Sequence, residues 1–219
     1  MEREQGKRRI GIIGAGALGS YFGIRLASGG ERVRFLLRSD YEAVREGGFR
    51  LELADGSSLV LEAPAIYRQP EDMGPLDWVL IALKTTRNDL FDPLLGPLVG
   101  PETVLVTLQN GIGNVEALQA LFPDNPVIAG LCQIGVNREG PGRIRSFVPG
   151  DGLVQLGAED GSPGRERLDA CQAMLEAAGI RVRRAASLGE ALWRKLMWNV
   201  PFNGLTVAIG GKGTDAVCG

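Results

Sequence analysis

The feature that most constrains the fold of this chain is a set of three spaced glycines between an apolar run and a helical pattern. The run at 9–13 reads RIGII, and Gly14, Gly16 and Gly19 follow it, the last of them inside a helical pattern over 17–28. In such an arrangement the first glycine permits a tight strand-to-helix turn, the second lets the backbone approach phosphates, and the third lets helix and strand pack closely. The start of the helix offers N–H groups and a positive dipole to an anion. The sequence therefore predicts a dinucleotide pyrophosphate site at this turn; a glycine-rich turn that binds nothing is the alternative.

The end of the second expected strand indicates which dinucleotide would bind. The apolar run at 32–37 leads into Arg38, Ser39 and Asp40, where the adenosine ribose is expected to lie. An arginine there can hold a 2′-phosphate through charge-assisted hydrogen bonds, whereas a carboxylate would accept hydrogen bonds from a free 2′-hydroxyl. Arg38 therefore favours NADP, although a small shift in register would bring Asp40 to the ribose and favour NAD. An ordinary surface arginine is the third reading.

The order of apolar runs and helical patterns predicts an α/β fold. Strands are expected near 9–13, 32–37, 76–83, 103–108 and 126–136, with helices near 17–28, 40–47, 87–99 and 113–122. A hairpin is expected over 51–61, a strand pair at 143–148 and 153–156, a helix over 164–178 and a short strand at 181–184. The inner strands are nearly unbroken apolar runs, as parallel strands covered on both faces should be. We therefore predict a doubly wound, Rossmann-type and mostly parallel sheet.

Composition excludes several classes of function. The chain contains no histidine, which rules out a Ser-His-Asp triad, a Cys-His pair and a histidine metal site, so proton transfer would fall to lysine, carboxylate, tyrosine or cysteine. The three cysteines, Cys132, Cys171 and Cys218, are widely spaced, which fits reduced packing residues and no structural zinc site. We accordingly expect no bound metal.

The charge pattern and the apolar runs bear on partners and location. A net charge of −2 with interspersed signs gives no electrostatic footprint for nucleic acid. No apolar stretch approaches the roughly twenty residues that a membrane helix requires, and the charged N-terminus is not followed by a signal-peptide segment. We expect a cytoplasmic protein with neither a nucleic-acid nor a membrane partner.

Polar residues follow two of the expected inner strands. Lys84 ends the run at 76–83, and Asn110 with Gly111 ends the run at 103–108. Both positions lie at carboxyl ends of parallel strands, beside the crevice where doubly wound folds bind ligands. Taken alone, the lysine could be a solvated strand end and Asn110-Gly111 an ordinary turn.

The last informative segment is an amphipathic helix that begins near residue 187. Ser187 and Glu190 have the spacing of a capping box, and Lys195 and Asn199 lie four residues apart on one face, with Asn203 a further turn along. A lysine and two amides on an otherwise apolar helix need polar partners when buried. A lysine that extends to water is the alternative.

These motifs together resemble the ketopantoate reductase (2-dehydropantoate 2-reductase) family. The resemblance runs from residue 10 to about 208 and rests on Gly-Ala-Gly-Ala-Leu-Gly at 14–19, Arg38, Leu83-Lys84, Gln109-Asn110-Gly111-Ile112-Gly113 and Leu192-Trp193-Arg194-Lys195-Leu196. It implies NADPH-dependent reduction of ketopantoate to pantoate in pantothenate biosynthesis.

The same resemblance implies a role for each matching residue. NADPH would be bound by Gly14, Ala15, Gly16, Ala17, Leu18, Gly19, Arg38, Lys84 and Asn110. The 2-oxoacid substrate would be bound by Lys84, Asn110, Lys195, Asn199 and Asn203, with Lys195 as the catalytic general acid. Burial would lower the pKa of such a lysine, and its charge would stabilise a developing alkoxide.

The chain departs from the family pattern in three places. Gly204 stands where proline is usual, Arg87 stands where glutamine is common, and the sequence stops where family members continue with further helices. We expect residues 1–185 to form an NADP-binding Rossmann domain and 186–219 to form the incomplete first part of an all-helical substrate and dimerisation domain. A homodimer is expected if that whole domain is present. The alternatives are a reductase of another small 2-oxoacid and a truncated NADP(H)-binding protein without catalytic activity.

Overall fold

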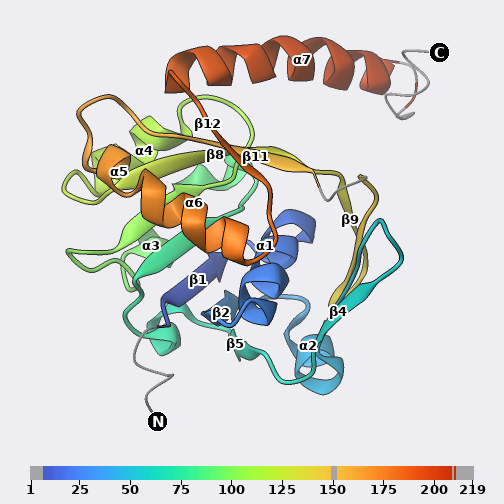
Figure 1. Cartoon of the computed structure of the whole chain (residues 1–219). Helices are drawn as coiled ribbons and strands as arrows, with labels where there is room; N and C mark the ends of the chain where they lie inside the picture. Colours follow the sequence, from blue (N-terminus) through green and yellow to red (C-terminus); the bar gives the residue numbers. More distant parts are fainter. Residues whose placement is uncertain (1–6, 149–151, 209, 211–219) are drawn as a thin grey trace.

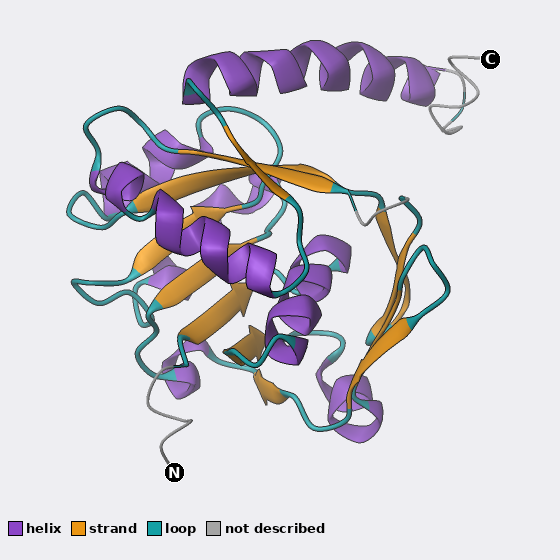
Figure 2. Cartoon of the chain, viewed as in Figure 1, coloured by secondary structure: helices purple, strands orange, loops and turns teal. Residues whose placement is uncertain are grey.

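A large, mostly parallel sheet forms the centre of the molecule (Figures 1 and 2). The computed structural model describes residues 7–148, 152–208 and 210. The strands of this sheet lie in the order β12-β11-β8-β7-β6-β1-β2-β5. Their bounds are β1 Arg9–Ile13, β2 Arg32–Leu36, β5 Ala65–Tyr67, β6 Trp78–Ile81, β7 Val104–Thr107, β8 Val127–Gln133, β11 Leu153–Gly157 and β12 Val182–Arg184. The strands from β8 to β5 are parallel, and β11 pairs antiparallel with β8, which confirms the predicted fold class.

Helices cover both faces of this sheet, as a doubly wound fold requires. On one face α1 (Ala17–Ser28) and α6 (Leu168–Ala177) pack against a core that includes Ile10, Ile12 and Val106. On the other face α3 (Phe91–Leu95) and α4 (Asn114–Leu121) pack against Ile13 and Ile81. Consecutive residues of β1 therefore serve two cores, which explains why the inner strands are continuously apolar.

A second sheet lies beyond α1. It has the order β4-β3-β10-β9, with β3 Phe49–Glu52, β4 Ser58–Leu61, β9 Val136–Gly140 and β10 Arg143–Ser146. The short helix α2 (Tyr41–Gly47) connects β2 to this sheet. Phe49 of β3 packs on Phe35 of β2 with their ring centroids 4.7 Å apart, so the small sheet shares the core of the α1 face.

The remaining elements are short, apart from the last helix. They are the 3-10 helices η2 (Pro70–Met73) and η3 (Thr85–Leu90) and the one-turn helix α5 (Pro163–Glu166). The long helix α7 (Leu188–Ala208) lies over β8 and β11 (Figure 1). The Ser187 hydroxyl accepts the Glu190 N–H at 3.4 Å, as the capping pattern predicts.

Three element predictions are wrong in detail. The expected strand at 126–136 is two strands, because the chain leaves the large sheet after Gln133 and enters the small one at Val136. The strands expected to pair at 143–148 and 153–156 lie in different sheets, since β10 pairs with β9 and β3 whereas β11 pairs with β8 and β12.

The third difference concerns the helix expected over 87–99. The structure has η3 and the short α3 there, because Pro93 is suited to the first turn of a new helix and Gly96-Pro97 ends that helix. The sequence reading also missed β5, a three-residue strand at the edge of the large sheet. The hairpin expected over 51–61 is confirmed, with β3 and β4 paired across the turn that holds Asp55-Gly56.

Candidate active site

The glycine turn lies at the carboxyl end of β1, next to β6. Gly14 has a left-handed backbone (φ 92°), and its carbonyl accepts the Gly16 N–H at 2.8 Å. A Cβ atom on Gly14 would lie 2.6 Å from the Leu83 nitrogen, closer than side chains approach backbone. Both the turn and the approach to the end of β6 therefore require glycine at this position.

The other two glycines of the motif have different surroundings. A Cβ on Gly19 would lie 2.3 Å from the Gly14 oxygen, so this glycine is needed for helix and strand to pack closely. A Cβ on Gly16 would meet nothing within 4 Å, and Gly16 caps α1 without a side-chain hydrogen bond or an acidic residue in the first turn. Open space beside N–H groups that lack intrahelical acceptors fits a pyrophosphate. Ala15 lies in the turn between Gly14 and Gly16, and Ala17 and Leu18 are the first two residues of α1.

The two candidate ribose residues at the end of β2 differ in their environments. Arg38 is exposed, and within the described part of the chain its guanidinium has no hydrogen bond or ion pair. Asp40 is buried, and its two carboxylate oxygens accept hydrogen bonds from Arg138 at 2.6 and 2.9 Å. Among the described residues, the Arg38 guanidinium is therefore unpaired, while Asp40 is already paired with Arg138.

Hydrogen bonds connect the residues after β6 with the loop after β7. Lys84 is exposed at the end of β6, and the hydroxyl of the next residue, Thr85, donates to the Asn110 carbonyl at 2.6 Å. Asn114, at the start of α4, also donates to this carbonyl, at 3.2 Å. The sequence reading thus placed Lys84 and Asn110 correctly at neighbouring strand ends, and the structure brings their loops together.

A chain of hydrogen-bonded side-chain amides, of which Gln109 and Asn114 are buried and Asn88 is half-buried, supports these two loops. The Gln109 amide donates to Asn88 at 2.9 Å, and Asn88 donates to Asn114 at 2.9 Å. Thr107, at the end of β7, donates to Gln109 at 3.1 Å. The sequence reading missed Asn88 and Asn114 as site residues, because a strand-end pattern does not show which amides meet across loops.

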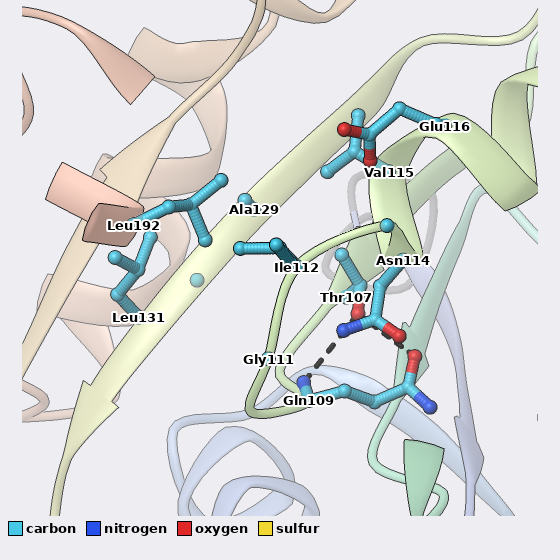
Figure 3. A pocket seen from close by; sticks show the side chains of 12 residues that line it. Thr107, Gln109, Gly111, Ile112, Asn114, Val115, Glu116, Ala129, Leu131 and Leu192 are labelled. Carbon is cyan, nitrogen blue, oxygen red and sulfur yellow. Dashed lines mark hydrogen bonds between the residues drawn. The ribbon is translucent and has the colours of Figure 1, made fainter. Parts of the chain in front are cut away.

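Helix α7 reaches the loop after β7 from the other side. Leu192 lines a small hollow together with Gly111, Ile112 and Leu131 (Figure 3). Leu192 precedes Lys195 by one helical turn, so both face the sheet. The amphipathic phase of the helix therefore brings Lys195 toward the carboxyl end of β8.

The ammonium of Lys195 is the most unusual polar group of the described structure. Its Nζ is buried, and no hydrogen-bond partner lies near it among the described residues. Burial lowers the pKa of Lys195 from its ordinary value of 10.5, and interaction with the Cys132 thiol of β8 opposes part of that shift. Burial also raises the pKa of Cys132 to about 12, against the effect of the lysine charge. An unpaired buried cation is costly, so a lysine kept in this state is a candidate proton donor.

The rest of α7 is described in part. Asn199 is half-buried one turn beyond Lys195, on the same face, as the spacing predicts. Asn203 and Gly204 lie on α7, but their side-chain positions fall outside the described structure, as does Cys218. Four large apolar side chains of the helix are exposed, Trp193, Met197, Trp198 and Val200.

The described ranges contain neither a membrane-spanning helix nor a cluster of metal ligands. No described helix combines the length and the apolar character needed to cross a membrane. Within the same residues, no three cysteine or acidic side chains gather as a metal site would require. Cys132 and Cys171 are free thiols.

Comparison with known proteins gives consistent matches. The family described as "Ketopantoate reductase PanE/ApbA" matches residues 10–161. The chain is 35% identical to the 2-dehydropantoate 2-reductase of Nostoc sp. and 32% identical to that of Halobacterium salinarum, covering 94% and 90% of this chain. The crystal structure of 2-dehydropantoate 2-reductase from Geobacter metallireducens superposes with a TM-score of 0.83 at 41% identity, over 90% of this chain and 64% of that one. The chain spans only 65% and 64% of the lengths of the Nostoc and Halobacterium relatives.

Proposed function

The chain belongs to the ketopantoate reductase family, and from this membership we propose that it reduces 2-dehydropantoate (ketopantoate) to pantoate with NADPH, a step of pantothenate biosynthesis. The single observation in the structure that best supports this proposal is the buried ammonium of Lys195, which has no hydrogen-bond partner among the described residues and lies at the sheet edge that holds the glycine turn. Such a group is suited to donate a proton to a carbonyl oxygen.

The residues at the carboxyl edge of the sheet fit a bound NADPH. The open space at Gly16 and the first turn of α1 would receive the pyrophosphate, and the free guanidinium of Arg38 would hold the 2′-phosphate. Ala15, Ala17 and Leu18 would contribute their backbone, with Gly14 and Gly19 shaping the turn. When bound, the cofactor supplies a hydride to the substrate carbonyl carbon.

Lys195 has the properties of the general acid. Burial disfavours the charged form of its side chain, so its pKa lies below that of a solvated lysine and transfer of its proton is easier. While charged, the ammonium also polarises a ketone oxygen and stabilises negative charge that develops there. After the proton has left Nζ for the alkoxide oxygen, water can restore it.

The remaining site residues would orient the substrate. Lys84 and Asn110 follow β6 and β7, and the Thr85–Asn110 hydrogen bond fixes their loops relative to each other. We propose that they lie near the nicotinamide and the substrate, and that Asn199 and Asn203 bind the hydroxy-acid from α7. Residues 1–185 would then form the cofactor domain, and 186–219 would open the substrate-binding helical domain.

There are two alternatives to ketopantoate reduction. The chain could reduce another small 2-oxoacid, since the residues proposed to bind the substrate recognise a carboxylate and a ketone and do not specify what else is attached. The other alternative is that the chain binds NADP(H) without turnover.

The test is NADPH oxidation by the purified 219-residue chain with ketopantoate, with NADH as a parallel cofactor. Ketopantoate-dependent loss of NADPH absorbance, with NADH a poorer donor, is the expected result. If ketopantoate fails and another 2-oxoacid succeeds, the substrate assignment is wrong. If every 2-oxoacid fails, a version extended to the length of the relatives separates an incomplete site from a chain that only binds.

The role of Lys195 has its own test. Lys195→Ala should abolish turnover and leave NADPH affinity nearly unchanged, since the lysine is assigned to the substrate and not to the nucleotide. Arg194→Ala is the matched control, because Arg194 is exposed and pairs with Glu190 on the same helix. Loss of NADPH binding in a folded Lys195→Ala chain would contradict the assignment.

A further inference from the structure

The Asp40 carboxylate is surrounded by hydrogen-bond donors. The residue is 7% exposed. Arg138 donates from Nε to Oδ2 at 2.9 Å and from Nη2 to Oδ1 at 2.6 Å, which is a bidentate pair. The Ser39 hydroxyl donates to Oδ1 at 2.9 Å, and the Gly142 backbone N–H donates as well.

This arrangement joins two distant parts of the chain. Asp40 belongs to the loop between β2 and α2, two residues after Arg38, whereas Arg138 lies on β9 and Gly142 in the turn between β9 and β10. The small sheet therefore supplies the counter-charge for a carboxylate beside the proposed ribose site. Arg38, in the same loop, is exposed and keeps its charge for a ligand.

We propose that Arg138 is a positioning residue that determines dinucleotide specificity. By pairing with Asp40, Arg138 keeps that carboxylate from contacting the ligand, so the β2–α2 loop binds a 2′-phosphorylated dinucleotide in preference to an unphosphorylated one. A free carboxylate at this strand end would accept hydrogen bonds from a ribose 2′-hydroxyl and would repel a 2′-phosphate. Pairing with Arg138 removes both effects at once. The inference rests on the proposed function only in requiring that a nicotinamide dinucleotide binds at the glycine turn.

The pair persists at neutral pH. Burial raises the pKa of Asp40, but the hydrogen bonds from Arg138 and Ser39 outweigh that effect, so the pKa lies below its ordinary value. The pKa of Arg138 is raised by the same hydrogen bond. Both partners are therefore charged throughout the range in which binding would be measured.

The test is the ratio of NADP⁺ to NAD⁺ affinity, measured by calorimetry on the full chain and on Arg138→Gln. Freeing the carboxylate should lower this ratio by on the order of tenfold, chiefly through weaker NADP⁺ binding. Adding Asp40→Asn to Arg138→Gln should restore the ratio, since no carboxylate then remains to be withheld. Arg145→Gln is the control, because Arg145 lies on the same small sheet in an exposed pair with Glu52 and should leave the ratio unchanged.

Each outcome decides a different point. If Arg138→Gln weakens NADP⁺ and NAD⁺ equally, or if Asp40→Asn fails to restore the ratio, Arg138 only supports the fold and the inference is overturned. If Arg138→Gln does not fold, as circular dichroism would show, the double variant and Asp40→Asn alone must still match or exceed the wild-type ratio. If the wild-type chain binds neither dinucleotide, the proposed function fails, and the inference fails with it.

Discussion

The same chemical change at two neighbouring glycines should have opposite consequences. A methyl group at Gly19 would lie 2.3 Å from the Gly14 oxygen, whereas a methyl group at Gly16 would meet nothing within 4 Å. Gly19→Ala therefore tests packing between α1 and β1. Gly16→Ala tests whether the open space at the start of α1 is a ligand site.

The structure gives the expected sizes. Overpacking against backbone costs roughly 1–3 kcal/mol, and alanine regains about 0.5–1 kcal/mol of helix propensity, so Gly19→Ala should lose about 1–2 kcal/mol of unfolding free energy. The unfolding free energy of Gly16→Ala should stay within about 1 kcal/mol of the wild-type value. Alanine is a poorer N-cap than glycine, which destabilises the folded chain, but it also reduces the conformational freedom of the unfolded chain, which acts in the opposite direction. With NADPH at about one hundred times its Kd, the wild-type chain should gain about 2.7 kcal/mol. Gly16→Ala should lose most of this gain.

Urea unfolding of the wild-type chain and of both variants, with and without NADPH, measures these unfolding free energies. Gly19→Ala should have a midpoint lower by roughly half a molar without ligand, given the usual dependence on denaturant. The reasoning would be refuted by a Gly16→Ala chain that keeps the full NADPH-dependent gain. It would equally be refuted by a Gly19→Ala chain as stable as wild type.

Two further predictions follow from the ionisable groups. Lys195→Met should stabilise the chain most near neutral pH and progressively less as the pH rises toward 10.5. The reason is that, as the pH falls below 10.5, the lysine of the unfolded chain binds a proton before the lysine of the folded chain does. Urea unfolding of both chains between pH 7 and 10.5 measures this difference in stability, and a pH-independent difference would contradict the buried-charge argument. Burial raises the pKa values of Cys132 and Cys171 to about 12, so both thiols should resist iodoacetamide at pH 8 in the native chain and react after unfolding. Peptide mapping by mass spectrometry measures the labelling. Rapid labelling of the native chain would show that these thiols are more accessible than they are in the structure.

Much of the central fold could be predicted from local sequence. The glycine turn, the order of strands and helices around it and the hairpin at 51–61 all depend on short-range patterns of apolar and turn residues, and each is present. The boundary between β8 and β9 could not be predicted, since the largely apolar segment that forms β8 continues to Val136, the first residue of β9. What separates them is the identity of their pairing partners, which lie far away in sequence.

The candidate site also has a part that local sequence predicts and a part that depends on contacts between distant residues. Strand ends at Lys84 and Asn110 could be placed together because parallel strands end at one edge. The role of Asp40 could not be assigned, because its partner lies 98 residues away on the small sheet. The burial of Lys195 likewise depends on how α7 rests on β8, which helical spacing alone does not determine.

The start of α7 is anchored before the helix reaches the site. The Ala185 N–H donates to the Leu156 carbonyl at 2.8 Å, and Leu188 and Ala191 are buried against the sheet. Each residue of an α-helix turns the chain by about 100° and advances it by about 1.5 Å, so Leu188 and Lys195, seven residues apart, lie on the same face. The short connection at 185–187 and the burial of Leu188 therefore set the direction in which the Lys195 side chain points, and a change that turned Leu188 away from the sheet would turn Lys195 away with it. The orientation of the proposed proton donor is in this sense fixed two turns upstream, by residues to which no role in substrate or cofactor binding is assigned.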